Sequence, residues 1–207
     1  MGVLGSAFNP PHIGHLILAQ EAFAQLALSE VLLVPTGRAP HKRIEADPGA
    51  GVRVEMTQLA AGDDDRLGVS ELEAERDEVS YSFRTLELLR EQRPGDEPVW
   101  IMGADAAVEL GTWRRPERVL ELARLGVVER GGVTRADVES VLEELSAGGG
   151  AEFVDMPAIE VSSTMVRERV AGGRPIRYLV PDAVAALIEE RGLYPGVAEG
   201  AGGSRTA

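Results

Sequence analysis

Short apolar runs alternate along the chain with longer stretches in which apolar residues recur at helical spacing. Between the first two runs, Leu16, Ala19, Phe23 and Leu26 follow one another at intervals of three or four residues, which is typical of a half-buried helix. Strands that alternate with helices favour a parallel sheet joined by crossover helices. The sequence therefore predicts an α/β fold.

The boundaries of the elements follow from the same pattern. Strands are predicted at residues 3–4, 31–34, 67–70, 99–102, 126–128 and 153–156, and helices at 16–26, 52–61, 82–92, 117–124 and 135–145. A last helix is predicted over residues 181–191, because Pro181 falls in its first turn and Gly192 just beyond its end.

The chain of 207 residues is long enough to bury a core without metals or cross-links. We expect one domain over residues 1–194 and a disordered tail over residues 195–207. The sequence contains no cysteine and no run of membrane-spanning length, and we expect no signal peptide. We therefore expect a cytoplasmic protein without membrane contact.

The net charge limits the kinds of partner that we expect the protein to bind. Asp and Glu total 34 against 21 Lys and Arg, which gives a formal charge of −13. Such a protein is not attracted to nucleic acid or to an anionic membrane, and no predicted helix carries a basic face. An anionic substrate would need positive groups gathered locally, and we expect no nucleic-acid partner.

Two of the three histidines follow the first predicted strand and a glycine-containing turn. If a helix begins near Pro11, His12 and His15 share one face at its amino end, where N–H groups and the helix dipole favour anions. Gly14 between them would leave room for a nucleotide close to the backbone. The alternative is an ordinary helix start, with Asn9 as the cap and both imidazoles in solvent. The paired spacing after a strand and a turn favours a phosphate site.

A second cluster of polar residues opens a late helix. Ser162, Ser163 and Thr164 precede Arg167, and three hydroxyls with a guanidinium can coordinate a polyphosphate at the amino end of a helix. Plain capping would also explain the hydroxyls, although no Glu or Gln follows any of them at the position of a capping box. Capping and phosphate binding can coexist.

Together these segments resemble the His-x-Gly-His nucleotidyltransferases, and among them the nicotinate-mononucleotide adenylyltransferases. Further similar motifs follow in order: Pro40-His41-Lys42, Ser80-Tyr81-Ser82 with Thr85, Gly103-Ala104-Asp105 with Leu110 and Trp113, and the segment from Arg177 to Pro181. The polar neighbours of Trp113 favour an exposed stacking surface, whereas Trp100 lies within an apolar run and is expected in the core. The resemblance spans about residues 3 to 194.

The resemblance implies a Rossmann-like, doubly wound parallel sheet with a small C-terminal helical segment. It implies adenylyl transfer from ATP, accompanied by Mg²⁺, to a pyridine mononucleotide, with no metal ligands of the protein's own. It implies catalytic roles for His12, His15 and Arg167; ATP binding by Gly5, Phe8, Gly14, Gly103, Asp105, Ser162, Ser163 and Thr164; and mononucleotide binding by Asn9, Lys42, Ser80, Tyr81, Ser82, Thr85 and Trp113. The oligomeric state is left open, with a homo-oligomer among the options.

Departures from the family pattern bear on substrate preference and rate more than on reaction type. The segment Gly5-Ser6-Ala7-Phe8-Asn9-Pro10 stands where bacterial members usually read Gly-Gly-Thr-Phe-Asp-Pro, and Gly131 stands where they read Pro. Asparagine at the position of Asn9 is also seen in relatives that accept nicotinamide. Ala7 lacks a hydroxyl that could donate to phosphate.

Other functions remain to be separated from this one. A pantetheine-phosphate adenylyltransferase or a cytidylyltransferase would share the fold, but the segment from Ser80 to Thr85 and Trp113 favour a pyridine ring. A non-catalytic nucleotide-binding protein is supported by Ala7 and Gly131 and opposed by the intact histidine pair. The sequence does not settle nicotinate against nicotinamide mononucleotide, and the resemblance to the bacterial enzymes favours nicotinate.

Overall fold

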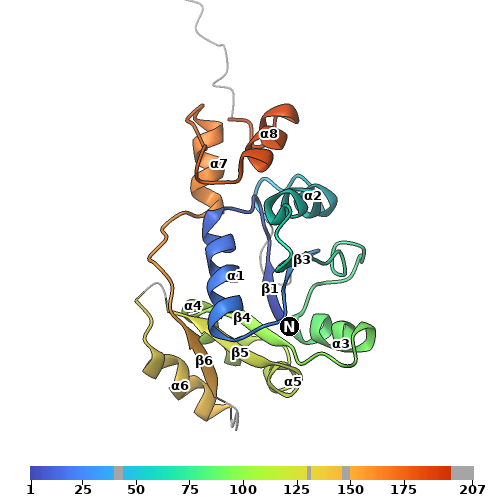
Figure 1. Cartoon of the computed structure of the whole chain (residues 1–207), viewed down its shortest axis with the longest axis vertical. Coiled ribbons are helices and arrows are strands. Elements are labelled where there is room, and N and C mark those ends of the chain that lie inside the picture. The colour runs from blue at the N-terminus through green and yellow to red at the C-terminus, as the bar shows by residue number, and fades with distance from the viewer. Residues whose placement is uncertain (40–43, 130–131, 146–149, 197–207) are drawn as a thin grey trace, which may run out of the picture.

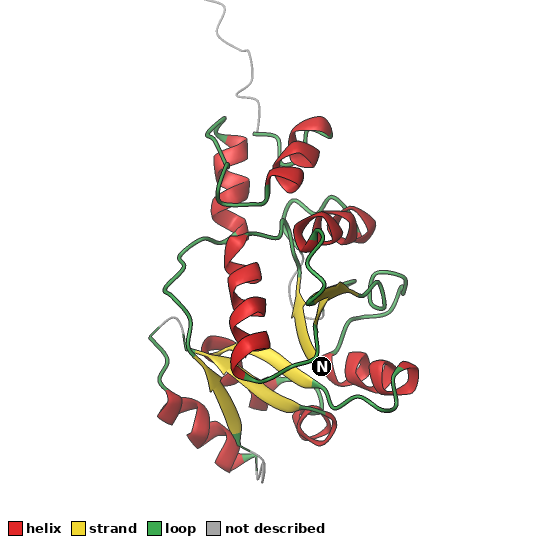
Figure 2. Cartoon of the chain, in the orientation of Figure 1, coloured by secondary structure: helices red, strands yellow, loops and turns green. Residues whose placement is uncertain are grey.

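Six parallel strands form one sheet in the order β3-β2-β1-β4-β5-β6 (Figures 1 and 2). The computed structural model describes residues 1–39, 44–129, 132–145 and 150–196. The strands are β1 (Gly2–Ser6), β2 (Val31–Pro35), β3 (Leu67–Val69), β4 (Val99–Gly103), β5 (Arg124–Val128) and β6 (Ala151–Val154). The doubly wound parallel sheet predicted from the sequence is thus confirmed.

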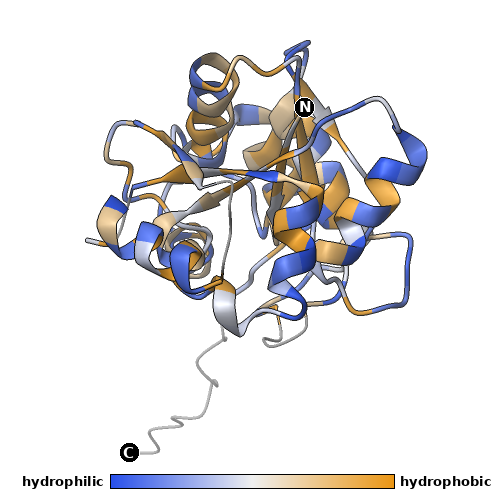
Figure 3. Ribbon diagram, turned by 90° about the horizontal axis from the view of Figure 1, so that it is seen from below, coloured by the Kyte–Doolittle hydropathy of each residue, from blue (hydrophilic) through white to orange (hydrophobic). Residues whose placement is uncertain are grey.

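Successive residues of the central strands face opposite sides of the sheet, and both sides are buried. In β2, Leu32 and Val34 belong to one core, whereas Val31 and Leu33 belong to the other. A strand that is covered on both faces reads as a continuous apolar run, which is how these strands are recognised in the sequence. Figure 3 shows apolar residues on the strands and on the helix faces that turn toward them.

Helices cover both faces of the sheet. They are α1 (Ile13–Gln25), α2 (Ala50–Ala61), α3 (Ser82–Gln92), α4 (Ala104–Ala107), α5 (Pro116–Leu122), α6 (Arg135–Glu144), α7 (Ser163–Ala171) and α8 (Asp182–Glu190), with a short 3₁₀ turn, η1 (Leu110–Thr112). The first core joins one face to α3, α4, α5 and α6, and the second joins the other face to α1 and the end of α2.

A third apolar cluster packs the C-terminal helices against α2. Met56 of α2 lies with Val166 of α7 and with Val184 and Ile188 of α8. The backbone N–H of Ile13 donates to the carbonyl of Leu179 at 3.0 Å, so this C-terminal segment also touches the amino end of α1 (Figure 1). The predicted C-terminal helical segment is therefore anchored beside the first loop of the sheet.

Several predicted boundaries were wrong, and two of them have a clear physical reason. The helix predicted over residues 117–124 ends at Leu122, because Ala123 is extended and Arg124 already pairs with Val99 in the sheet. The strand predicted over residues 153–156 lies instead at Ala151–Val154. It ends there because the N–H of Asp155 donates to the side chain of Gln25 at 2.9 Å instead of continuing the ladder.

The end of the chain is described as far as residue 196, so the predicted tail falls almost wholly outside the described residues. In the described part, no helix combines the length and the apolar character that crossing a membrane requires.

Candidate active site

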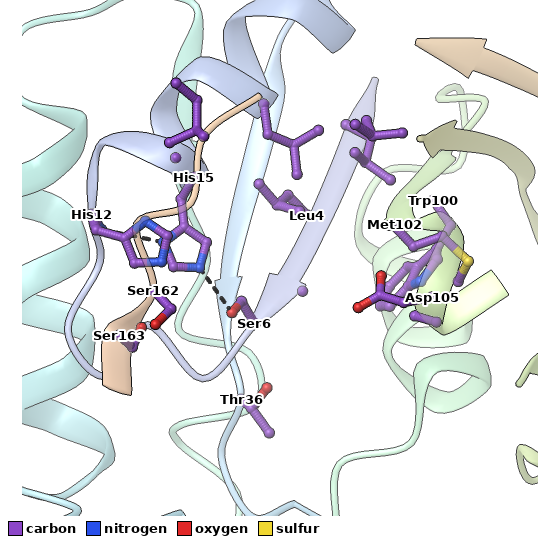
Figure 4. A pocket seen from close by; sticks show the side chains of 18 of the residues that line it. Leu4, Ser6, His12, His15, Thr36, Trp100, Met102, Asp105, Ser162 and Ser163 are labelled. Atoms are coloured by element: carbon purple, nitrogen blue, oxygen red, sulfur yellow. Dashed lines mark hydrogen bonds between the residues drawn. The ribbon is translucent and has the colours of Figure 1, made fainter. Parts of the chain in front are cut away.

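A cavity of about 960 Å³ opens at the carboxyl ends of the strands, where the strand order reverses between β1 and β4. Its wall includes Gly5 and Ser6 from the end of β1, Met102 and Gly103 from β4, and Val128 from β5. Figure 4 shows Ser6 and Met102 among the side chains of this wall. In open α/β sheets this crevice is the usual ligand site, and the volume suits a nucleotide. The sheet topology therefore places a binding site beside the first loop.

His12 and His15 lie next to each other on one side of the cavity (Figure 4). Their ring centroids are 3.8 Å apart, and Nδ1 of His15 accepts a hydrogen bond of 3.2 Å from the backbone N–H of His12. A neutral imidazole that accepts at Nδ1 carries its proton on Nε2, which lies 3.3 Å from Oγ of Ser6 and donates to it. The cavity wall thus presents an N–H donor on His15.

The histidines reach this arrangement in a way that differs from the sequence expectation. Helix α1 begins at Ile13 instead of near Pro11, so His12 is the N-cap residue and has extended backbone angles. The two rings come together because the His15 side chain turns back across the N-cap. Asn9 does not cap the helix, and the alternative of an ordinary capped start with solvent-facing imidazoles was wrong.

Gly14 makes space for the ring of His12. A Cβ atom at Gly14 would lie 3.0 Å from Nδ1 and 3.1 Å from Cε1 of His12, and 3.4 Å from Ile159. The two contacts with His12 are tighter than ordinary van der Waals packing. Gly14 lines the cavity, but the room that its missing side chain leaves is filled by the imidazole. The glycine of the motif therefore sets the position of the first histidine.

The serines that open α7 line the same cavity. Ser162 is the N-cap, and its hydroxyl accepts from the backbone N–H of Met165 at 3.2 Å, so capping does occur. Ser163 donates its hydroxyl to the carbonyl of Pro10 at 2.8 Å, which joins α7 to the first loop. Both residues lie close to His12 (Figure 4). Segments from the two ends of the chain thus form one wall.

Arg167 and Thr164 do not line the cavity. The Arg167 guanidinium donates to the carbonyl of Asn9 at 2.9 Å, to the Glu45 carboxylate at 3.2 Å and to the Thr164 hydroxyl at 3.3 Å. Its guanidinium therefore contacts the first loop and Glu45 instead of the cavity in this structure. The expectation that both side chains face the phosphates is therefore not met here.

Another part of the wall comes from α3 and from the segment after β4. Ser80, Tyr81, Ser82 and Trp113 all line the cavity, together with Gly103 and Asp105. The Ser80 hydroxyl accepts from the backbone N–H groups of Gly37 and Arg38 at 3.2 and 3.3 Å, which fixes the loop after β2. In Figure 4, Asp105 lies across the cavity from the histidines. The sequence motifs are thus brought to one cavity.

Trp100 is buried in the core, as predicted, and its ring also forms part of the cavity wall. A Cβ at Gly5 would come within 3.1 Å of that ring. Gly5 therefore serves first to let Trp100 pack against β1.

Three predicted contact residues are buried and are not among the residues that line the cavity. Phe8 is fully buried and its ring packs on His15 with centroids 4.9 Å apart. Asn9 is buried between Glu45 and Tyr194, and Thr85 donates its hydroxyl to Glu73 at 2.5 Å. These side chains hold the loops that carry the site. Lys42, with the rest of the 40–43 segment, and Gly131 lie outside the described residues.

Arg53 was missed in the sequence because it is one charged residue on a helix that was expected to be amphipathic. Its side chain is fully buried and donates to the carbonyls of Ala7, Thr36 and Gly37 at 2.9, 2.6 and 3.1 Å. It also pairs with Asp47 at 2.9 Å. One guanidinium thus joins the loops after β1 and β2.

Glu73 was missed as well. Its carboxylate lines the cavity, accepts from the Thr85 hydroxyl and accepts from the N–H of Gly37 at 3.3 Å. No short-range pattern distinguishes it among the many acidic residues of this segment. Its role depends on long-range packing.

The fold and this cavity define a nucleotidyltransferase of the cytidylyltransferase-like class, and residues 3–169 match the family model with that description. The chain is 42% identical over 194 residues to a probable nicotinate-nucleotide adenylyltransferase of Exiguobacterium sibiricum, covering 94% of this chain and 98% of the relative. It therefore belongs to the nicotinate-nucleotide adenylyltransferase family.

A second relative agrees with this family, and a solved structure shows the same fold. A probable nicotinate-nucleotide adenylyltransferase of Roseiflexus sp. (strain RS-1) is 41% identical over 196 residues, covering 94% of this chain and 97% of the relative. The solved structure of Plasmodium falciparum nicotinic acid mononucleotide adenylyltransferase, complexed with NaAD, superposes with a TM-score of 0.75 at 16% identity. It covers 93% of this chain and 96% of that chain, and at this identity it shows the shared fold.

Proposed function

We propose that this protein transfers the adenylyl group of ATP to nicotinate mononucleotide, giving nicotinate adenine dinucleotide and pyrophosphate in NAD biosynthesis. The observation that carries the proposal is the histidine pair at the amino end of α1, facing a nucleotide-sized cavity at the switch point of the sheet. Identity of about 40% to nicotinate-nucleotide adenylyltransferases supports the choice of acceptor.

The chemistry needs positioning more than proton transfer. A phosphate oxygen of the mononucleotide attacks the α-phosphorus of ATP, and the bond from that phosphorus to the oxygen bridging to the β-phosphate breaks. The nucleophile is already an anion, so no general base is required. Catalysis then consists of holding two anions in line and stabilising charge on the transferred group.

The histidines supply that stabilisation in our proposal. Nε2 of His15, which donates to Ser6 in this structure, would donate to the triphosphate, and His12 would lie beside it. The dipole of α1 adds positive potential at the same place. Ser162 and Ser163 would contact ATP, and Arg167 would join them after leaving Glu45.

Magnesium enters this proposal as part of the MgATP substrate. Within the described residues, no group of three or more His, Cys, Asp or Glu side chains is placed to hold a metal ion. Mg²⁺ retains several waters and binds readily through substrate phosphates, so the protein needs no carboxylate cage. The metal would neutralise phosphate charge when bound.

The mononucleotide would occupy the part of the cavity formed by Ser80, Tyr81, Ser82 and Trp113, with the indole against the pyridine ring.

A cytoplasmic location stays a prediction from the sequence.

The test is pyrophosphate release with MgATP and, in separate assays, nicotinate mononucleotide, nicotinamide mononucleotide or phosphopantetheine. We expect the highest kcat/KM with nicotinate mononucleotide. His15→Ala should lower kcat by about 100-fold or more, as loss of a donor to the transition state does in other enzymes. Unchanged turnover in that variant, or release with phosphopantetheine alone, would reject the proposal.

A further inference from the structure

The wall of the cavity carries few positive charges. Among the described residues that line it, Glu73, Asp105, Glu129 and Glu160 are acidic, and Arg114 is the one side chain that is cationic at every physiological pH. Both substrates of the proposed reaction are anions. Arg114 therefore supplies charge of the sign that the substrates need.

Arg114 is held over an aromatic ring. Its guanidinium carbon lies 4.9 Å from the centroid of the Tyr81 ring, and Nη1 donates to the Tyr81 hydroxyl at 3.3 Å. Among the described residues, no carboxylate forms an ion pair with it. A guanidinium has five N–H donors in a plane, and this geometry suits a carboxylate that accepts two parallel hydrogen bonds.

The position of Arg114 indicates which group of the substrate it meets. It follows Trp113 in the chain and contacts Tyr81, and both residues line the cavity where the proposed function places the pyridine ring. The reacting phosphate belongs at the other end, beside the histidines. At the pyridine end, nicotinate mononucleotide carries a carboxylate, whereas nicotinamide mononucleotide carries a neutral amide.

We propose that Arg114 binds the pyridine carboxylate and thereby selects nicotinate over nicotinamide mononucleotide, an inference that rests on the proposed function. Stacking on Tyr81 holds the guanidinium before the ligand arrives, so little side-chain freedom is lost on binding. The neutral amide would gain much less from the same cation. Arg114 is thus a specificity-determining residue outside the phosphate-binding machinery.

The neighbouring arginine provides a matched control. The guanidinium carbon of Arg115 lies 5.0 Å from the centroid of the Phe83 ring, and Arg115 does not line the cavity. Arg114→Gln and Arg115→Gln each remove one charge and one aromatic contact from an exposed side chain. The two variants differ in whether the lost cation faces the ligand.

The experiment measures kcat/KM for both mononucleotides at saturating MgATP in the wild type and the two variants. We expect Arg114→Gln to lower the value for nicotinate mononucleotide by about tenfold or more, and that for nicotinamide mononucleotide by less than about threefold. Arg115→Gln should leave both values within about twofold of the wild type. Thermal unfolding of each variant checks that the fold is intact.

The outcomes distinguish a failure of the inference about Arg114 from a failure of the proposed function. A wild type that is active, with Arg114→Gln unchanged or with equal losses for both mononucleotides, overturns the role of Arg114 and leaves the proposed function in place. A wild type that transfers to neither mononucleotide overturns both. A selective loss for nicotinate mononucleotide supports both.

Discussion

The phenol of Tyr194 donates a hydrogen bond of 2.7 Å to the side-chain oxygen of Asn9, across 185 positions of sequence. The amide nitrogen of Asn9 in turn donates to the carbonyl of Glu45 at 2.7 Å. Burial raises the pKa of the Tyr194 phenol, so the hydroxyl remains a protonated donor. The last described turn of the chain therefore fixes the loop that leads into the histidine motif.

Removing this hydroxyl should destabilise the fold. In Tyr194→Phe the Asn9 oxygen stays buried without its donor, and we expect the free energy of unfolding to fall by about 1–3 kcal/mol. Urea denaturation monitored by circular dichroism measures the change. The control is Tyr178→Phe, because Tyr178 is 74% exposed and its hydroxyl loss should change the free energy by less than about 0.5 kcal/mol. Equal effects of the two variants would contradict a structural role for the Tyr194 hydroxyl.

We expect Asn9 to stabilise the loop without affecting the preference between the two mononucleotides. Asn9→Asp restores the residue that is usual in the bacterial family but removes the donor to Glu45 and buries a carboxylate. We expect a loss of about 1–3 kcal/mol in unfolding free energy. Since the side chain does not line the cavity, the ratio of kcat/KM for the two mononucleotides should stay within about twofold of the wild type. A reversed ratio would place Asn9 in contact with the ligand.

Most of the fold could be predicted from the sequence because buried parallel strands appear as continuous apolar runs. Each run such as Val31–Pro35 is apolar on both faces. In each crossover helix, apolar residues recur at helical spacing. Errors occurred where a strand begins with a polar residue, as β5 does at Arg124, or where the residue after a strand bonds to a side chain, as Asp155 does after β6. Such ends depend on pairing partners far away in the sequence.

The candidate site was predicted in part. The sequence identified His12, His15, Ser162 and Trp113, and the structure brings all four to one cavity. The sequence could not predict which side chains of these motifs point into the cavity. Phe8, Asn9 and Thr85 belong to the same segments as the lining residues and differ from them in the direction of the side chain. The sequence also could not identify Arg53 or Glu73, whose roles come from loops that meet only in the folded chain.

Arg53 should be among the costliest residues to replace. In Arg53→Met the carbonyls of Ala7, Thr36 and Gly37 lose a buried donor and Asp47 loses its partner. We expect about 3–5 kcal/mol of destabilisation, as when one member of a buried charged network is removed. The comparison is Arg191→Met, where a 40% exposed side chain pairs with Glu55 and the expected cost is below about 1 kcal/mol. Similar denaturation midpoints for the two variants would show that the buried network contributes little.

Gly14→Ala should separate stability from activity. Alanine is the better helix former at this second residue of α1, so the free energy of unfolding should be unchanged or rise by up to about 1 kcal/mol. The new Cβ would lie 3.0 Å from Nδ1 of His12 and displace the ring, and we expect kcat to fall by about tenfold or more because misplaced donors stabilise the transition state poorly. Ring resonances of His12 in the ligand-free protein should shift, which distinguishes displacement of the imidazole from a clash with substrate.

Gly51→Ala is the matched control for that variant. Gly51 is also the second residue of its helix, α2, and a Cβ there would meet no atom within 4 Å. It should gain the same helix propensity and keep the wild-type kcat. If Gly14→Ala behaved in the same way, with full activity and unmoved His12 resonances, the glycine of the His-x-Gly-His motif would not be what positions the imidazole. A loss confined to Gly14→Ala ties the spacing of the motif to the packing of its first histidine.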